Sequence, residues 1–216
     1  MRFFIPLSIF FGALTGFMTC TSDGQSTSEG TGQIAQIETE HQEPDRITAL
    51  EQEIHRLQEK TRFDNARLRK EVDDLRMELL CREQVKFSKV SYQSTDNLSI
   101  PAYLFEPLKA GKYPAILWVH GGQHGTLSSR SLPRIIEWVQ SGYVIFAPDY
   151  RGSSGYSEAF YHKADYGGKE IDDLVAAVDF LETLPPVIKK QIGVIGASHG
   201  GYNSLMAIIR YPDRFK

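Results

Sequence analysis

Three short apolar runs, separated by two amphipathic segments, constrain the fold of this chain more than any other feature. The runs lie in 113–122 (YPAILWVHGG), 143–152 (YVIFAPDYRG) and 190–198 (KQIGVIGAS). Continuous apolar runs of this length are typical of strands that are buried on both faces of a parallel sheet. The segments between them, 131–142 and 167–184, have helical periodicity and end at a glycine and at a pair of prolines. The alternation predicts an α/β fold with a mostly parallel, doubly wound sheet.

Two further strands precede this alternation. Apolar and polar residues alternate over 85–94, and a second strand-like stretch, 98–107, follows a turn at Asp96 and Asn97. We expect an antiparallel pair that opens the domain at about Val85.

The third apolar run ends in Gly196-Ala197-Ser198-His199-Gly200, a G-x-S-x-G pattern. On a strand-turn-helix frame, such a serine occupies a strained turn with its hydroxyl projecting. Side chains at the two glycines would collide with neighbouring backbone. The following segment, 202–211, has the spacing of a helix that packs on a sheet. A tight turn without a catalytic role is the alternative, but the context favours Ser198 as the nucleophile of an α/β-hydrolase.

His120-Gly121-Gly122 directly follows the first apolar run. The α/β-hydrolase architecture places one backbone amide of the oxyanion hole at this point, and the second donor would be the amide of His199. We expect the backbone of this loop to be functional and the His120 ring to make a structural hydrogen bond.

Several stretches together resemble the catalytic domain of the prolyl oligopeptidase family, serine peptidases and related esterases of α/β-hydrolase fold. The stretches are WVHGG (118–122), PDYRGSSGYSEAF (148–160), EIDDLVAAVDFL (170–181) and GASHGGYNSLMAIIRYPDRFK (196–216). The resemblance covers about 85–216.

This resemblance implies a hydrolase that cleaves peptide or ester bonds through an acyl-enzyme on Ser198. It also implies that the stretch 151–156 shapes the wall of the site, with Arg151 and Tyr156 binding substrate. A glycine-rich surface loop is the alternative interpretation of that stretch. The larger peptidases of the family precede this domain with a β-propeller, which the present sequence lacks at that position, so an esterase is as plausible as a peptidase.

A serine nucleophile needs a general base and an orienting acid, which follow it in this fold in the order Ser, Asp or Glu, His. No residue follows Lys216 in this sequence. His199, His124, His162 and Asp149 are poor substitutes, because a triad depends on geometry that sequence proximity does not supply. We therefore expect a truncated or split form of a longer hydrolase, with an unpaired apolar edge on its last strand.

Residues 44–84 read as one long charged helix. Its apolar positions follow a heptad seam that is interrupted at Thr61 and Asp64 and then resumes with a shifted phase. The seam consists of Ile47, Leu50, Ile54 and Leu57, then Leu68, Val72, Leu75 and Leu79. One interpretation is a coiled-coil stalk that forms a homo-oligomer, and the other is a solvated helix lying on its own domain or on a partner.

The first twenty residues have the layout of a secretory signal, with Arg2 followed by an apolar run. Cys20 comes directly after the run and is a candidate for lipidation, although Phe17 and Thr19 depart from the usual bacterial lipoprotein pattern. An unmodified cysteine and an uncleaved anchor are the alternatives. Residues 21–43 are too polar to form a core and predict a disordered tether. We expect an exported protein of the bacterial cell envelope, attached to the membrane through its signal or a lipid.

Composition excludes other classes of function. The 24 basic and 27 acidic residues give a net charge of −3, so no large basic surface for nucleic acid is expected. Cys20 and Cys81 are too few for a disulfide framework or a zinc site, and no metal or organic cofactor is implied. The sequence favours an exported serine hydrolase acting on a peptide or small ester. The alternative is an inactive coiled-coil envelope lipoprotein that uses a partial hydrolase fold for binding or assembly.

Overall fold

The computed structural model of the chain describes residues 43–216. The expected signal segment, Cys20 and all but the last residue of the expected tether lie outside this part. In chain order the elements are α1 (Glu43–Cys81), β1 (Lys86–Gln93), β2 (Ser99–Glu106), β3 (Tyr113–Val119), a 3-10 helix (Ser129–Ser131), α2 (Leu132–Gln140), β4 (Val144–Pro148), α3 (Glu158–Tyr161), α4 (Lys169–Thr183), β5 (Val187–Gly196), α5 (His199–Arg210) and a second 3-10 helix (Pro212–Arg214).

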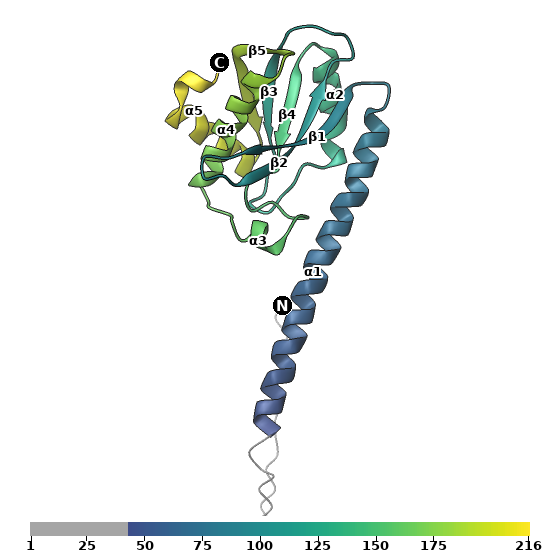
Figure 1. Cartoon of the computed structure of the whole chain (residues 1–216), viewed down its shortest axis with the longest axis vertical. Helices are drawn as coiled ribbons and strands as arrows, with labels where there is room; N and C mark the ends of the chain where they lie inside the picture. The colour runs from purple at the N-terminus through teal and green to yellow at the C-terminus, as the bar shows by residue number, and fades with distance from the viewer. Residues whose placement is uncertain (1–42) are drawn as a thin grey trace, which may run out of the picture. The chain divides into compact units, whose positions relative to one another are not determined.

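The strands form one mixed sheet in the order β1-β2-β4-β3-β5 (Figure 1). Strand β3 pairs in parallel with β4 and with β5, whereas β2 is antiparallel to both β1 and β4. The strand pair expected at 85–107 is the β1–β2 hairpin, whose turn holds Asn97 in the left-handed region with φ 61°. The predicted α/β fold is confirmed, with the antiparallel β2 inserted beside the parallel strands.

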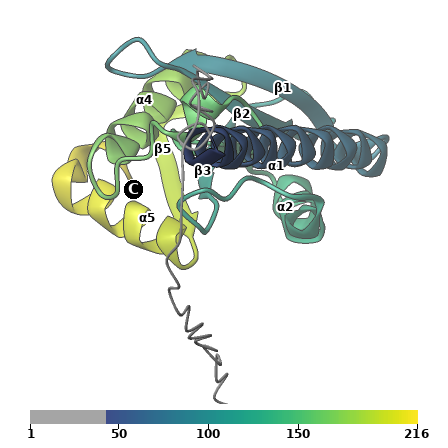
Figure 2. The same cartoon turned by 90° about the horizontal axis from the view of Figure 1, so that it is seen from below.

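Side chains of the central strands alternate between two cores, one on each face of the sheet. In β4, Val144 and Phe146 enter one core, whereas Ile145 and Ala147 enter the other. Helices α4 and α5 cover the first face, and α1 and α2 cover the second (Figure 2). Burial on both faces explains why these strands read as continuous apolar runs in the sequence.

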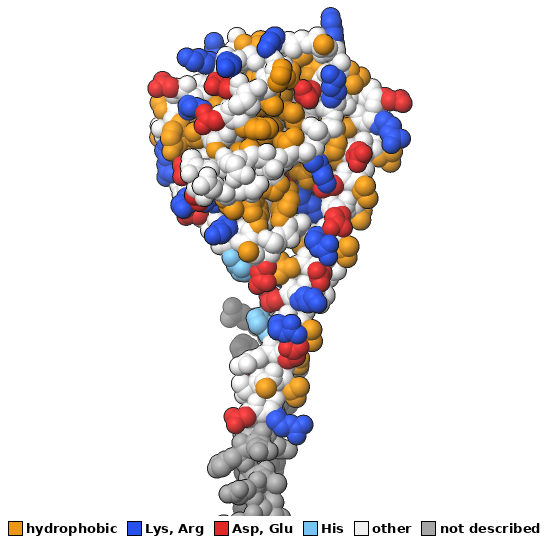
Figure 3. Space-filling view, in the orientation of Figure 1, with side chains coloured by type: hydrophobic (Ala, Val, Ile, Leu, Met, Phe, Trp, Pro, Cys, Tyr) orange, Lys and Arg blue, Asp and Glu red, His pale blue; other side chains and the backbone are white. Residues whose placement is uncertain are grey.

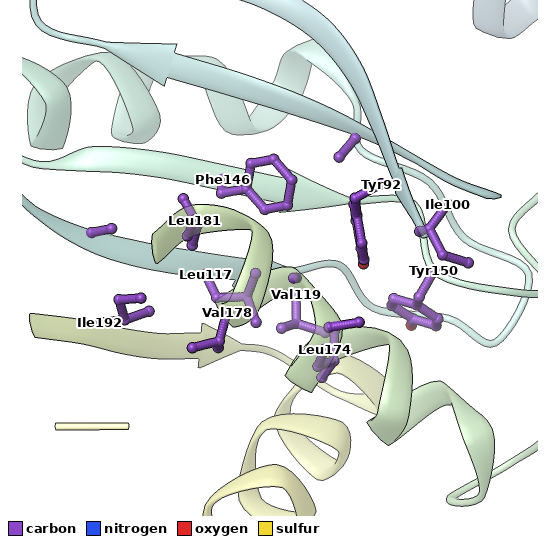
Figure 4. Close-up of a cluster of buried hydrophobic side chains, with 14 of the residues drawn as sticks. Tyr92, Ile100, Leu117, Val119, Phe146, Tyr150, Leu174, Val178, Leu181 and Ile192 are labelled. Atoms are coloured by element: carbon purple, nitrogen blue, oxygen red, sulfur yellow. The ribbon is translucent and has the colours of Figure 1, made fainter. Parts of the chain in front are cut away.

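The first core is the larger of the two. In Figure 4, Leu117 of β3 and Ile192 of β5 lie against Val178 and Leu181 of α4, and all four side chains are fully buried. This packing ties α4 to the two strands that end at the candidate site.

The connections that follow β3 and β5 run to opposite faces of the sheet. The chain passes from β3 to α2 on one face of the sheet, and from β5 to α5 on the other (Figure 2). In open α/β sheets a ligand crevice forms where neighbouring parallel strands diverge in this way, beyond their carboxyl ends. The segments after β3 and β5, beginning at His120 and Ala197, therefore meet at the expected position of a site.

The C-terminal half of α1 packs on the α2 side of the sheet (Figures 1 and 2). Met77 and Cys81 are buried in the second core. Asp73 accepts hydrogen bonds from the Ser129 backbone N–H and hydroxyl at 2.8 and 2.6 Å. Farther toward the N-terminus, the Arg62 guanidinium donates to the Tyr161 hydroxyl at 2.7 Å. Part of the long helix thus lies on its own domain.

The far side of β5 is covered only in part. Within the described strands β5 pairs with β3 alone, and the Lys216 N–H donates to the Ile192 carbonyl at 3.0 Å. Helix α5 exposes three apolar side chains nearby, Leu205, Ile208 and Ile209. The free edge expected from the sequence is therefore present in the part of the chain that the structure describes.

Candidate active site

Ser198 occupies the turn between β5 and α5 in a strained conformation. Its φ of 56° and ψ of −124° lie outside the regions that a residue with a side chain ordinarily adopts. Such strain costs on the order of 1–3 kcal/mol and persists only where the surrounding structure enforces it. The residue is exposed and stands directly before the first turn of α5. This is the backbone that lifts a serine hydroxyl out of a strand-to-helix turn.

The glycines of the G-x-S-x-G pattern allow this turn to pack. A Cβ at Gly196 would lie 2.3 Å from the Gly200 carbonyl oxygen. A Cβ at Gly200 would lie 2.2 Å from the Val119 carbonyl oxygen and 2.5 Å from that of His120. All three distances are far below van der Waals contact, which confirms the steric reason given for the glycines. Helix α5 therefore packs directly on the end of β3.

The loop after β3 adjoins the nucleophile turn. A Cβ at Gly121 would lie 3.0 Å from the Ala197 carbonyl oxygen and 3.6 Å from the Ser198 Cβ. Gly122 has a φ of 82°, so this loop also uses the left-handed region that favours glycine. The structure thus brings together the two segments that the sequence assigned to the oxyanion hole and the nucleophile.

Tyr150, which follows β4, fixes the orientation of this loop. Its hydroxyl donates to the carbonyl oxygens of His120 at 3.0 Å and Gly122 at 3.3 Å. In a trans peptide the N–H points opposite to the C=O, so the Gly121 N–H points away from Tyr150. Sequence reasoning did not single out Tyr150, and its place directly after a buried strand is the signal that could have found it.

The His120 ring is structural, as expected. It is buried, stacks on the Tyr150 ring with centroids 4.2 Å apart, and its Nε2 lies 3.0 Å from the Ser153 Oγ. Burial lowers the pKa of this ring although the nearby Asp149 carboxylate acts in the opposite sense. The neutral ring therefore stabilises the loop through its contacts with Ser153 and Tyr150.

Asp149 is a fully buried anchor beneath the same loop. Its carboxylate accepts hydrogen bonds from the Leu127 N–H at 2.6 Å and from the Thr126 and Tyr156 hydroxyls at 2.5 and 2.6 Å. The ammonium of Lys70, on α1, lies 2.8 Å away. Burial, the largest single influence, raises the pKa of Asp149, but the Lys70 charge, His120 and the hydrogen bonds to the carboxylate together outweigh it and lower that pKa overall. Helix α1 thus supplies the counter-charge for a group next to the candidate site.

Arg151 is a buried structural residue in this fold. The guanidinium donates to the Asp173 carboxylate at 2.9 and 2.6 Å and to the Asp96 carboxylate at 3.0 and 3.1 Å. The residue is 2% exposed, so its placement gives no support to the expected contact with substrate. The same holds for Tyr156, whose hydroxyl is bound to Asp149.

His199 turns its ring away from the serine that precedes it. Its Nε2 lies 2.7 Å from the Oε2 of the fully buried Glu170, and the Asn203 side-chain amide donates to the same oxygen at 3.2 Å. Its backbone amide, in contrast, belongs to the first residue of α5, where helix N–H groups are free to bind an anion. Glu170 was not predicted, because nothing in the sequence links it to a residue 29 positions away.

The other candidate bases lie elsewhere. His124 stacks on Tyr161 with centroids 3.7 Å apart, and its Nδ1 is 2.7 Å from the Gly152 carbonyl. His162 lies 3.8 Å from Glu158. Between residues 43 and 216, no histidine or carboxylate is hydrogen-bonded to the Ser198 hydroxyl. That part of the chain also holds no group of three or more potential metal ligands.

Replacing Gly200 by alanine tests whether the contact of α5 with β3 positions the nucleophile. The added Cβ would overlap two carbonyl oxygens, and overpacking of this kind costs about 1–3 kcal/mol or more. We expect lower stability in urea and slower covalent labelling of Ser198. Gly193→Ala is the matched control, since a Cβ at Gly193 meets no atom within 4 Å. Equal behaviour of the two variants would contradict the steric argument.

Comparison with known families matches residues 130–216 to the prolyl oligopeptidase family. The matched part begins just before α2 and includes β4, α4, β5 and the turn that carries Ser198. The match is partial, because it leaves out β1 to β3 and the loop after β3.

Proteins of similar sequence are also named as peptidases. Uncharacterized peptidase YuxL of Bacillus subtilis is 31% identical over 134 residues, which is 59% of this chain and 20% of that protein. Dipeptidyl-peptidase 5 of Porphyromonas gingivalis is 34% identical over 113 residues, which is 50% of this chain and 16% of that protein. The chain therefore spans only a small part of the length of these relatives.

Solved structures give the same fold. The acylaminoacyl peptidase of Pyrococcus horikoshii is similar with a TM-score of 0.55 and 26% identity, over 64% of this chain and 23% of that chain. The likeness confirms the predicted α/β-hydrolase fold.

Proposed function

Residues 130–216 belong to the prolyl oligopeptidase family, and from this we propose that the chain carries the nucleophile and oxyanion hole of a serine hydrolase. The observation that carries the proposal is the Ser198 backbone, held at φ 56° and ψ −124° with Gly121 packed against it. A purely structural turn would not need an exposed serine in so strained a conformation.

The chemistry follows from the placement of the groups. The Ser198 hydroxyl attacks the carbonyl carbon of a peptide or ester, and the carbonyl oxygen becomes an oxyanion. The amides of His199 and of the His120–Gly122 loop are the proposed donors to that oxygen, and loss of one such donor typically costs about 10²–10³ in kcat. As the oxyanion collapses, the C–N or C–O bond of the substrate breaks and the amine or alcohol leaves with the proton that the general base took from Ser198. The acyl group then resides on Ser198 until water adds to it and releases it as a carboxylic acid.

The general base and its orienting acid are proposed to belong to a part of the hydrolase domain that these 216 residues do not include. Two facts support this. Three described histidines are engaged elsewhere, with His199 on Glu170, His120 on Ser153 and His124 on Gly152. In this fold, moreover, the acid and base follow the nucleophile along the chain. Without them, the oxyanion hole and binding alone would leave about 10³–10⁴-fold catalysis over water.

We propose a peptide as the substrate, because relatives bear names such as dipeptidyl-peptidase 5 and acylaminoacyl peptidase. An esterase is the alternative within the same chemistry. Hydrolysis of aminoacyl-p-nitroanilides would support the peptidase, whereas turnover of short p-nitrophenyl esters alone would support the esterase.

A fluorophosphonate probe tests the nucleophile directly, because it bonds covalently to an activated serine. We expect labelling to add one probe mass per chain and Ser198→Ala to abolish it. Ser91→Ala, at an exposed position of β1, is the control and should label like the unchanged protein. Labelling that survives in Ser198→Ala would place the nucleophile elsewhere.

The second candidate is an inactive envelope protein that uses the partial hydrolase fold for binding or assembly. The absence of any base hydrogen-bonded to Ser198 within residues 43–216 favours it. Absence of labelling in the folded protein, shown by an unchanged circular dichroism spectrum, would support this candidate against the enzyme.

Export and attachment to a membrane are part of the proposal and rest on the layout of residues 1–20. No helix in the described part, residues 43–216, has the length and apolar character needed to cross a membrane. If Cys20 carries a lipid, Cys20→Ser should move the protein from the membrane fraction to the soluble fraction of the cell. Retention in the membrane fraction would instead favour an uncleaved signal anchor.

A further inference from the structure

One face of α1 carries an apolar stripe, made of two blocks with Thr61 and Asp64 between them, that the domain does not cover (Figure 3). At 3.6 residues per turn its eight side chains fall within an arc of about 80°. Each of them is 47–67% exposed. The stripe consists of Ile47, Leu50, Ile54, Leu57, Leu68, Val72, Leu75 and Leu79. Large apolar side chains in such a row are unusual on a surface that faces only water.

The domain lies on the opposite face of the helix. Lys70, Met77 and Cys81 are 6%, 0% and 1% exposed, and they point about 180° away from the centre of the stripe at 3.6 residues per turn. Val72 lies between the first two in sequence and is 58% exposed. A second helix could therefore lie along the stripe without displacing the α/β domain.

We propose that the stripe pairs with the same stripe of a second copy, which makes the protein a dimer through a parallel two-stranded coiled coil. In the first block, Ile47 and Ile54 take the a positions of the heptad, and Leu50 and Leu57 take the d positions. β-Branched residues at a with leucine at d favour two parallel strands over three or four.

The interruption in the seam keeps the stripe on one side of the helix. From Thr61 to Val72 the spacing of seam positions is three, four and four, which is an eleven-residue step. Such a step locally unwinds the left-handed supercoil without ending the contact. The second block then repeats the pattern, with Val72 at a and Leu75 at d.

Charges beside the stripe suit a parallel pair. In a parallel coiled coil, each g residue faces the e residue of the following heptad on the partner helix. Arg46 of one copy would then face Glu51 of the other, and Glu71 would face Arg76. All four side chains are exposed, and both pairs join opposite charges.

The N-terminal part of α1 extends beyond the α/β domain (Figure 1). Arg62 and Phe63 contact Tyr161 of the domain. Isolated helices are marginal in water, so the turns from 45 to 61 need a partner surface to remain helical. The stripe, about 48 Å long at 1.5 Å per residue, offers that surface to a second copy.

The test measures the mass of the full chain, solubilised if necessary in a density-matched detergent, by sedimentation equilibrium. We expect twice the chain mass. The variant Leu50→Lys/Leu57→Lys should give the single-chain mass, because it places charges in the seam. The control Gln52→Lys/Glu59→Gln adds the same charge on the face away from the stripe and should stay dimeric. A single-chain mass for the unchanged protein overturns the proposal, and a mass of three chains overturns the two-stranded form.

A cross-link tests the parallel register without disturbing the fold. In a Cys20→Ser background, Leu57→Cys should form a disulfide between copies, because parallel alignment brings the two d positions together. Gln52→Cys, on the far face, should not. Burial of Cys81 raises the pKa of its thiol to about 11, so this residue should not compete. A covalent dimer of Gln52→Cys but not of Leu57→Cys would overturn the proposed face.

Discussion

Replacing Lys70 by methionine should destabilise the protein by about 3–5 kcal/mol at neutral pH, because it leaves a buried carboxylate without its counter-charge. Lys70 is 6% exposed and Asp149 is fully buried, and their charged atoms lie 2.8 Å apart. The Lys70 ammonium also donates to the Tyr103 hydroxyl and lies 4.7 Å from the centroid of that ring. Methionine keeps the length of the side chain but provides neither the charge nor the donor.

The pH dependence separates loss of charge from loss of packing. In the unchanged protein the pKa of Asp149 is lowered, so its contribution to stability is present above the ordinary pKa and is lost as the pH falls. Without Lys70, burial should raise that pKa instead, and protonation then relieves the buried charge. The difference between the two proteins should therefore shrink as the pH falls toward about 4, near the ordinary pKa of aspartate.

Urea unfolding followed by circular dichroism at pH 7 and near pH 4 measures this difference. Lys60→Met is the matched control on the same helix, since Lys60 is exposed and should change stability by less than about 0.5 kcal/mol. We also expect Lys70→Met/Asp149→Asn to recover part of the loss. A difference that stays constant with pH would show that packing, and not the charge, is responsible.

Loss of Lys70 should also loosen the loop beside the candidate site. Asp149 holds the Leu127 N–H and the Thr126 hydroxyl, and these residues end the loop that begins at His120. A loosened loop should slow fluorophosphonate labelling of Ser198 even under conditions where Lys70→Met remains folded. This coupling connects the long helix to the chemistry of the domain.

The periodicity of the sequence predicted the helices and strands, because each element buries side chains at its own local repeat. The stretches 113–122 and 143–152 contain apolar runs because they include β3 and β4, whose side chains pack on both faces of the sheet. The helix expected over 44–84 is α1, and its seam was visible because apolar spacing is a local signal. Which face of α1 meets the domain was not visible, because the buried face is marked by Lys70 and Asp74, polar residues whose partners are distant in sequence.

The candidate site, like the fold, was predicted only where its residues have a local signature in the sequence. The turn at Ser198 and the loop at Gly121 have local signatures, since both need glycine where backbone segments approach closely. Tyr150 and Glu170 were missed because their roles depend on hydrogen bonds to residues far along the chain. The role expected for Arg151 followed from a resemblance, whereas its ion pairs became visible only in three dimensions.

Replacing Arg151 by methionine should have an effect as large as that at Lys70, about 3–5 kcal/mol, because it strands the carboxylate of Asp173 in the core. Asp173 is fully buried, and without the guanidinium it keeps only the Ser94 hydroxyl at 2.5 Å and the backbone N–H of residue 151 at 3.0 Å. The same change releases Asp96 from the guanidinium, so the β1–β2 turn loses one of its links to α4 and keeps those through Ser94 and Lys169.

A neighbouring ion pair provides the control for this prediction. The Lys169 ammonium lies 3.3 Å from the same Asp96 carboxylate, but its side chain is 55% exposed, so Lys169→Met should cost less than about 1 kcal/mol. Arg151→Met/Asp173→Asn should be more stable than Arg151→Met, because it removes the stranded charge. Urea unfolding at pH 7 compares the variants. If Arg151→Met costs no more than Lys169→Met, the guanidinium is not the buried counter-charge, and its release for contact with a substrate becomes the better interpretation.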